Sequence, residues 1–161
     1  MTRPALERQV ELPDRRATRH LGRALAGGLS AGDLVVFSGP LGSGKTFLVR
    51  ALCRALGLGA AHRVTSPTFS LVHEYPTTPR ALHADLYRLE GEREVLDLGL
   101  EEQRELGAAL LVEWGAPFLE LLGGDALLVE LAVEPRRARL QATGPRSTAA
   151  LAALLAGAST R

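Results

Sequence analysis

Four residues at fixed spacing, Gly39, Gly44, Lys45 and Thr46, could together hold a phosphate chain and a divalent cation. In their pattern, G-x-x-x-x-G-K-T, the glycines let backbone N–H groups turn inward around an anion without obstruction by a Cβ atom. A helix that begins at the second glycine adds unpaired amides and the positive end of its dipole. The lysine ammonium can reach the β- and γ-phosphates, and the threonine hydroxyl offers a hard oxygen to Mg²⁺. The segment therefore predicts a Walker A loop that binds ATP and Mg²⁺.

A glycine-rich turn without a ligand is the alternative interpretation, because the chain contains 17 glycines. The context favours the phosphate-binding loop. The apolar run at 34–37 is typical of a strand buried on both faces, and apolar residues at helical spacing follow from 44 to 56. Lys45 is also the only lysine among the 19 Lys and Arg residues, so a compact ammonium stands where the motif requires one. The residues expected to contact the nucleotide are Gly39, Leu41, Gly42, Ser43, Gly44, Lys45, Thr46 and Phe47.

Two carboxylates are candidates to complete the cation site. Mg²⁺ that is bound through a Walker A threonine usually takes a second carboxylate at the end of a neighbouring strand. Glu113 follows the apolar run at 108–112, and Asp85 ends the run at 81–84. Either side chain would project from the carboxyl end of a strand, where open α/β sheets place their ligands. Each could instead be a solvated carboxylate at a strand end.

Three further features carry weaker indications. Ser66, Pro67 and Thr68 place two hydroxyls in a connection between elements, which is typical either of a switch segment near a γ-phosphate or of an ordinary proline turn. Trp114 could belong to the core or support the site beside it. His83 is expected to be structural, because the sequence places no other ligand at metal spacing around it.

Strands that alternate with helices would have to position these side chains. The sequence predicts strands at 8–12, 34–37, 69–75, 81–85, 108–112, 126–133 and 139–142. It predicts helices at 14–29, 44–56, 92–106 and 147–155. This series indicates the α/β class, with a mixed central sheet flanked by helices in a three-layer P-loop NTPase fold.

The composition is typical of a single globular domain over residues 1–161, with 46% hydrophobic and 23% charged residues. The formal net charge of +1 gives no long-range field that would recruit nucleic acid or an anionic membrane. Cys53 is the only cysteine, so an internal disulfide is excluded and burial on a helix is expected. No apolar run approaches the roughly 20 residues that span a bilayer. We therefore expect a cytoplasmic protein without a membrane segment.

Four blocks of sequence, taken together and in order, resemble the TsaE family of tRNA threonylcarbamoyladenosine biosynthesis ATPases. They are GPLGSGKTFLVRAL, VTSPTFSLVHEY, HADLYRLE and LLVEWG. Many NTPases share the first block, whereas the other three in succession are specific, and the likeness covers nearly the whole chain. The resemblance implies a protein that hydrolyses ATP slowly and acts with TsaB and TsaD. In that family those partners attach a threonylcarbamoyl group to adenosine 37 of tRNA, so this chain would meet tRNA only indirectly.

The resemblance also implies roles for the matched residues. Lys45 would hold phosphate, Thr46 and Glu113 would bind Mg²⁺, and Asp85 would act in hydrolysis or switching. Lys45 and Asp85 are therefore the expected catalytic residues. The residues that the resemblance assigns to a nucleotide-sensing loop and to the functional surface are Ser66, Thr68 and Trp114.

One departure from the family pattern bears on nucleotide binding. Phe47 stands where a second hydroxyl is usual, and its loss could weaken contact with the α-phosphate while leaving the Mg²⁺ site intact. The family likeness also places the adenine near residues 14–18 and Arg136.

Two other nucleotide-dependent activities compete with this interpretation. A small-molecule kinase is the main alternative, since Walker A loops also serve phosphotransferases, although no segment resembles a lid with clustered arginines. A GTPase is disfavoured because the guanine-reading N-K-x-D motif cannot form in a chain without asparagine. Arg136, Arg137 and Arg139 form a small basic cluster that is expected to be a solvated turn rather than an RNA-binding site.

Overall fold

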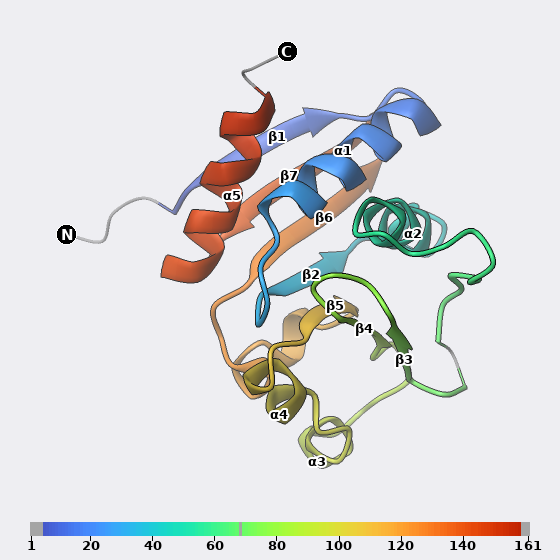
Figure 1. Ribbon diagram of the computed structural model, residues 1–161, viewed down its shortest axis with the longest axis vertical. Coiled ribbons are helices and arrows are strands. Elements are labelled where there is room, and N and C mark those ends of the chain that lie inside the picture. Colours follow the sequence, from blue (N-terminus) through green and yellow to red (C-terminus); the bar gives the residue numbers. More distant parts are fainter. Residues whose placement is uncertain (1–4, 68, 159–161) are drawn as a thin grey trace.

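In the computed structural model, which describes residues 5–67 and 69–158, a seven-stranded sheet lies between two layers of helices (Figure 1). The strands are β1 (Glu7–Glu11), β2 (Leu34–Ser38), β3 (Val72–Tyr75), β4 (Ala81–Asp85), β5 (Ala109–Glu113), β6 (Leu127–Val133) and β7 (Arg136–Ala142). The helices are α1 (Arg15–Gly28), α2 (Lys45–Ala55), α3 (Glu92–Leu96), α4 (Leu100–Glu105) and α5 (Pro145–Ala158), with 3₁₀ turns η1 (Ala116–Phe118) and η2 (Glu120–Leu122). The prediction of a three-layer α/β fold with a mixed sheet is confirmed.

The order of the strands places the candidate site residues together at the carboxyl ends of three inner strands. That order is β1-β7-β6-β2-β5-β4-β3. The four strands β6, β2, β5 and β4 run parallel, while β3 at one edge and β7 and β1 at the other are antiparallel to their neighbours. Phe37 of β2 pairs with Glu113 of β5, which pairs in turn with Asp85 of β4. The carboxyl ends of these three strands therefore lie side by side, next to the loop that leaves β2.

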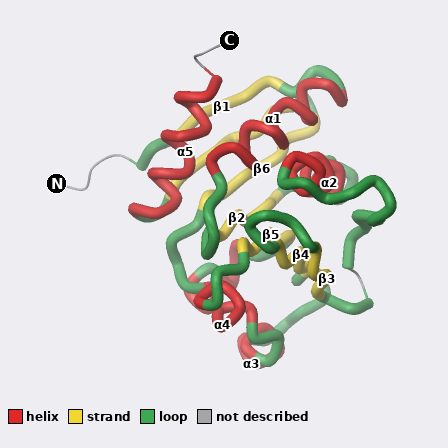
Figure 2. Tube along the Cα trace, in the orientation of Figure 1, coloured by secondary structure: helices red, strands yellow, loops and turns green. Residues whose placement is uncertain are grey.

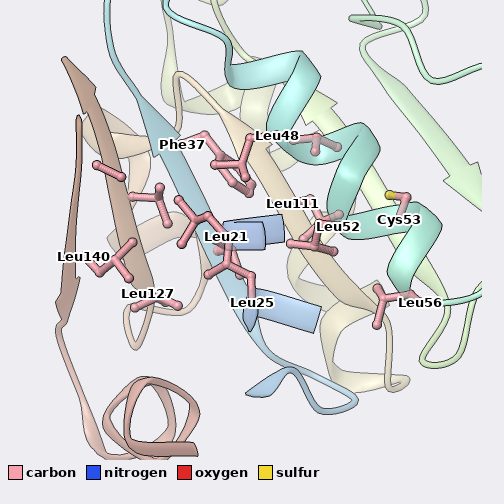
Figure 3. Packing of buried hydrophobic residues seen from close by; sticks show 14 of the residues in the cluster. Leu21, Leu25, Phe37, Leu48, Leu52, Cys53, Leu56, Leu111, Leu127 and Leu140 are labelled. Carbon is pink, nitrogen blue, oxygen red and sulfur yellow. The ribbon is translucent and has the colours of Figure 1, made fainter. Parts of the chain in front are cut away.

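Helices α1, α2 and α5 cover the face of the sheet on which the site lies (Figures 1 and 3). Figure 3 shows leucines of α1 and α2 meeting Phe37 and Leu111 of the central strands. Each such side chain stabilises the fold by about 1.5–3 kcal/mol when fully buried. The α2 residue Cys53 belongs to this cluster, and burial raises the pKa of its thiol to about 12, so the expected burial on a helix is confirmed. The apolar face of α2 is thus fixed against the strand that precedes it.

The opposite face of the sheet is covered by α3, α4 and the turn η2, which bury Val95, Leu100 and Leu122. Side chains of β5 alternate between the two clusters, with Leu111 in the first and Leu110 and Val112 in the second. This strand is buried along its whole length, as its unbroken apolar run predicts. Among the described residues, no helix combines the length and the apolar character that crossing a membrane requires.

Two predicted elements are divided or shortened by residues with left-handed backbone. The single helix expected at 92–106 is two helices, because Gly99 takes φ +66 and separates α3 from α4. The strand expected at 69–75 begins only at Val72, because Leu71 has φ +65 and cannot continue a strand. The connection from α2 to β3 holds no helix or strand in its described part (Figure 2). Thr68, predicted to lie on a sensing loop there, is outside the described residues.

The strand predicted at 139–142 is longer than expected and begins at Arg136. It pairs over its whole length with β6, from Arg136 opposite Val133 to Ala142 opposite Leu127. The other side of β7 pairs with β1, so this strand is held on both sides. The prediction assigned Arg136 and Arg137 to the turn that joins β6 to β7, but that turn consists only of Glu134 and Pro135. The prediction of a solvated turn for the basic cluster is therefore wrong, because Arg136, Arg137 and Arg139 all lie on β7.

Candidate functional site

Glycines shape the loop between β2 and α2. Gly39 has φ +142, and a Cβ there would lie 2.6 Å from the Leu131 carbonyl oxygen and 2.8 Å from Ser43 Oγ, so only glycine fits. Gly44 has φ +100 and is the N-cap of α2, where no side chain caps the helix. The first amides of any α-helix lack an intrahelical acceptor. Those of α2 are thus open to an external anion, which the positive end of the helix dipole would also favour.

Lys45 folds over this loop rather than into solvent. Its Nζ donates hydrogen bonds to the Gly39 carbonyl at 2.6 Å and the Pro40 carbonyl at 3.0 Å. The side chain is 5% exposed, and burial lowers the pKa of the ammonium, while the carboxylates of Glu113 and Asp85 act in the opposite direction. A charged group this enclosed is suited to exchange carbonyl contacts for phosphate oxygens.

Thr46 and Glu113 meet across the end of the sheet. The Thr46 hydroxyl lies 3.1 Å from Glu113 Oε1 and 3.3 Å from Oε2, and the glutamate is 3% exposed. A hydroxyl beside a carboxylate is the hard-oxygen pair that suits Mg²⁺. Within residues 5–67 and 69–158, no three His, Cys, Asp or Glu side chains converge as a metal site. An ion at Thr46 and Glu113 would therefore need phosphate oxygens and water as its other ligands, as Mg²⁺ does in nucleotide sites.

His83 is a neighbour of Glu113 that the sequence interpretation missed. The imidazole is fully buried on β4, and its Nε2 lies 2.6 Å from Glu113 Oε2. The burial of His83 agrees with the expectation of a structural histidine. That expectation did not include the contact of the ring with Glu113, an expected metal ligand. The sequence could have indicated this position. Side chains of a strand alternate between its two faces, so His83, two residues before Asp85, lies on the same face as Asp85.

Asp85 is bonded to the connection before β3 rather than to the phosphate-binding loop. The Ser66 hydroxyl donates to Asp85 Oδ2 at 2.6 Å, and the backbone N–H of Tyr87 donates to Oδ1 at 2.9 Å. Asp85 and Glu113 are register partners, so the two carboxylates stand on adjacent strand ends. The structure thus joins two predicted residues, Ser66 and Asp85, that the sequence could not connect.

Trp114 lies beside the site rather than in the core. Its φ of +59 is a left-handed conformation that costs a residue with a Cβ about 1–2 kcal/mol. This backbone turn directs the indole over the Lys45 ammonium, with Nζ 4.4 Å from the ring centroid. The opposite contact is with Tyr87, whose ring centroid is 4.8 Å away. Strained residues of this kind cluster at functional sites, and here the strained backbone holds an aromatic ring against the Lys45 ammonium.

Comparison with known families assigns the chain to one of them. The model of the family described as Threonylcarbamoyl adenosine biosynthesis protein TsaE matches residues 12–140. That span includes the loop, β4 and β5, and therefore every candidate residue described above. The chain belongs to the TsaE family. The resemblance carried by the four sequence blocks is thereby confirmed.

Individual relatives support the same assignment. A protein of Streptomyces coelicolor named tRNA threonylcarbamoyladenosine biosynthesis protein TsaE is 40% identical over 152 residues, which cover 86% of this chain and 99% of the relative. The protein of the same name from Mycobacterium tuberculosis is 38% identical over 130 residues, covering 74% of this chain and 76% of its own. The crystal structure of YdiB from Bacillus subtilis shares the fold, with a TM-score of 0.79, 23% identity and coverage of 98% and 99% of the two chains.

A hollow next to the loop unites the segments that the TsaE resemblance associates with adenine. It has a volume of about 350 Å³ and is open to solvent. Its lining residues are Leu12, Pro13, Asp14, Arg15, Thr18, Gly42, Ser43, Gly44, Phe47, Leu131, Ala132 and Arg136. Phe47, which departs from the TsaE pattern, forms part of this wall, and the guanidinium groups of Arg15 and Arg19 lie 5.9 and 5.6 Å from its ring centroid. An aromatic ring and cations thus flank the loop where other TsaE chains are expected to have a hydroxyl.

Proposed function

We propose that this chain binds ATP with Mg²⁺ and hydrolyses it slowly as a component of tRNA threonylcarbamoyladenosine biosynthesis. Membership of the TsaE family carries the biosynthetic role and lends no support to a small-molecule kinase. One observation carries the nucleotide chemistry. The uncapped start of α2 lies beside the Lys45 ammonium and the Thr46–Glu113 pair. Groups that can bind an anion therefore lie next to groups that can bind a cation.

In this proposal the backbone amides at the start of α2 hold the phosphates, and Lys45 supplies the positive charge. The ammonium would exchange its contacts with the Gly39 and Pro40 carbonyls for oxygens of the β- and γ-phosphates. Thr46 and Glu113 would hold Mg²⁺, which when bound neutralises charge on the same oxygens. The Trp114 ring limits the paths that Lys45 can take, because it covers the ammonium.

Asp85 is proposed to act in hydrolysis. Its carboxylate stands at the strand end next to Glu113 and is held by Ser66 and by the Tyr87 amide. A carboxylate in this position can orient a water molecule toward the γ-phosphate, and the bond to Ser66 would transmit the state of the nucleotide to the connection before β3.

We further propose that the site faces protein partners, the TsaB and TsaD proteins, in the cytoplasm. A run of contacts leads outward from Lys45 through Trp114 to Tyr87, which is 53% exposed. Phe69 is 91% exposed and lies against the guanidinium of Arg88, the residue after Tyr87. Exposed aromatic side chains of this kind are enriched at protein interfaces. A partner that covered them would touch the segments that hold Asp85 and Lys45.

Equilibrium binding of a fluorescent ATP analogue tests the nucleotide chemistry. We expect binding with Mg²⁺ that weakens in EDTA, and Thr46→Val should raise the Mg²⁺ requirement roughly 10–100-fold, as loss of support for a metal does elsewhere. Asp85→Asn should leave affinity within about threefold but reduce hydrolysis roughly a hundredfold or more, the range of a general acid–base group. Absence of binding by the wild-type chain, or equal competition by GTP, would contradict the proposal.

Co-purification with the TsaB and TsaD proteins tests the role in the pathway. We expect association that depends on ATP and is lost in Phe69→Ser combined with Tyr87→Ser. Leu106→Ser changes an apolar residue of another surface, whose exposure of 75% lies between those of Phe69 and Tyr87, and should have no effect. Association that is the same with and without ATP, and the same in the double variant as in the wild type, would contradict the proposed partner surface. A kinase would instead consume ATP faster when a small-molecule acceptor is added.

A further inference from the structure

His83 is a buried ionisable side chain that contacts Glu113 directly, and the proposed chemistry leaves it without a role. Its Nε2 lies 2.6 Å from Glu113 Oε2, shorter than the 3.3 Å between that oxygen and the Thr46 hydroxyl. The other carboxylate oxygen, Oε1, is the one closer to Thr46, at 3.1 Å. The imidazole and the threonine thus hold the carboxylate from two sides, and the imidazole makes the shorter contact.

The hydrogen-bond pattern assigns the tautomer of His83. A carboxylate can only accept, so Nε2 must carry the hydrogen that it donates to Glu113. No hydrogen-bond partner reaches Nδ1 among the described residues. The hydrogen of this contact therefore lies on Nε2, and the ring donates it toward Glu113.

Packing fixes the orientation of the ring. His73 stands directly opposite His83 in the antiparallel register of β3 and β4, with ring centroids 6.5 Å apart at 80°. Tyr75 lies 6.2 Å away on the same neighbouring strand. These rings close the space around the imidazole, so a donor on Nε2 points at one carboxylate oxygen and cannot turn elsewhere without displacing them.

We propose that His83 is a positioning residue for the cation site: it holds Glu113 Oε2 so that Oε1 faces Thr46 and the bound Mg²⁺. The inference rests on the proposed function, since it assumes that Thr46 and Glu113 bind the ion. Partners that orient a metal ligand in this way are typically worth 10–100-fold in metal affinity. The carboxylate would otherwise be free to rotate, and the ion would have to order it on binding.

The test compares variants by the Mg²⁺ concentration that half-saturates binding of a fluorescent ATP analogue. His83→Leu removes the donor at similar volume and should raise that concentration roughly 10–100-fold. His83→Gln, whose amide nitrogen can occupy the Nε2 position, should restore it to within a few-fold of the wild type. His20→Leu makes the same chemical change at an exposed position on α1, away from Glu113, and should leave the value unchanged.

The outcomes separate this inference from the function on which it rests. A wild-type chain that binds nucleotide without any need for Mg²⁺ would refute the cation site itself. A normal Mg²⁺ requirement in His83→Leu, or an equally impaired one in His83→Gln, would overturn the role of His83 alone. Nucleotide binding in EDTA and thermal unfolding in EDTA should be equal for wild type and His83→Gln. If His83→Leu fails to fold, His83→Asn replaces it, because its amide falls short of Glu113 and should behave as the donor-free variant.

Discussion

Helices α1 and α2 differ in what their first backbone amides, which lack an acceptor within the helix, can bind. Helix α1 begins after Asp14, whose carboxylate accepts a hydrogen bond from the Ala17 amide at 2.8 Å. Helix α2 begins after Gly44, which has no side chain to offer its amides. The start of α5 resembles α1, since the distant Asp125 accepts from the amides of Arg146 and Ser147 at 2.7 and 2.9 Å.

The difference is the reason why the start of α2, and not that of α1 or α5, is proposed as a ligand site. Asp14 and Asp125 place a negative charge of the protein itself at the positive end of a helix, which satisfies the amides and excludes another anion. At the start of α2 no carboxylate caps the amides, and the ammonium of Lys45 lies beside them. The acidic residue Glu113 is bonded to the Thr46 hydroxyl instead. In the proposed function, a phosphate would meet open amides with a cation beside them, and its metal ion would meet a carboxylate.

The largest effect is expected from Lys45→Ala, which removes the cation from the open helix start. Affinity for the ATP analogue should fall roughly a hundredfold, since hydrogen bonds to charged groups contribute about 1.5–3 kcal/mol each. Arg16→Ala removes the same charge from an exposed position on α1 and should leave affinity unchanged. Fluorescence anisotropy titrations measure both. Similar losses in the two variants would mean that only net charge matters.

A smaller effect is expected from Gly44→Ala, which places a Cβ on the backbone that presents the amides. Gly44 and Gly57 stand before and after α2, each with φ +100 and with open space where a Cβ would lie. Both alanine variants should therefore lose about 1–2 kcal/mol of unfolding free energy, the cost of the left-handed conformation. Only Gly44→Ala should also weaken nucleotide binding, by roughly five- to thirtyfold if the loop rotates to relieve the same strain. Chemical denaturation and binding titrations on both variants check this pairing.

The smallest effect is expected at the closed helix start. Asp14→Ala should lower the unfolding free energy by about 1 kcal/mol, the usual worth of an N-cap, and the midpoint of thermal unfolding by about 2–4 °C. Asp14→Asn should retain nearly all of the stability, because asparagine caps a helix about as well as aspartate. Calorimetry compares the three chains. An equal loss in both variants would show that the charge, rather than the hydrogen bond to Ala17, closes this helix.

Much of the fold could be predicted because local patterns agreed with the final elements. The strand at 81–85 has the predicted bounds, and the helix predicted at 14–29 is α1 with its caps included. The exceptions are places where one backbone angle overrides a favourable pattern, as at Gly99 and Leu71. A left-handed φ leaves no clear trace in composition when it falls at a leucine, and a polar stretch with one glycine still reads as helix.

The candidate site could be predicted residue by residue but not contact by contact. Lys45 and Thr46 follow from one continuous motif, and both carboxylates follow from their places after apolar runs. The apolar runs alone do not decide which carboxylate approaches Thr46, because both are strand ends; the TsaE resemblance is what assigned Glu113 to the cation site. The structure places Glu113 there, since β5 lies next to β2 whereas β4 lies one strand further away.

The sequence by itself predicted the Walker A loop, because its glycines, lysine and threonine are close together in the chain and would act through the backbone between them. The TsaE resemblance assigned Glu113 to the same site as Thr46, and only the tertiary structure showed their contact, the position of His83 behind Glu113, and the Trp114 ring over Lys45. These contacts join residues from strands that are distant in sequence, so they depend on strand order and register, which are set by the packing of both helix layers.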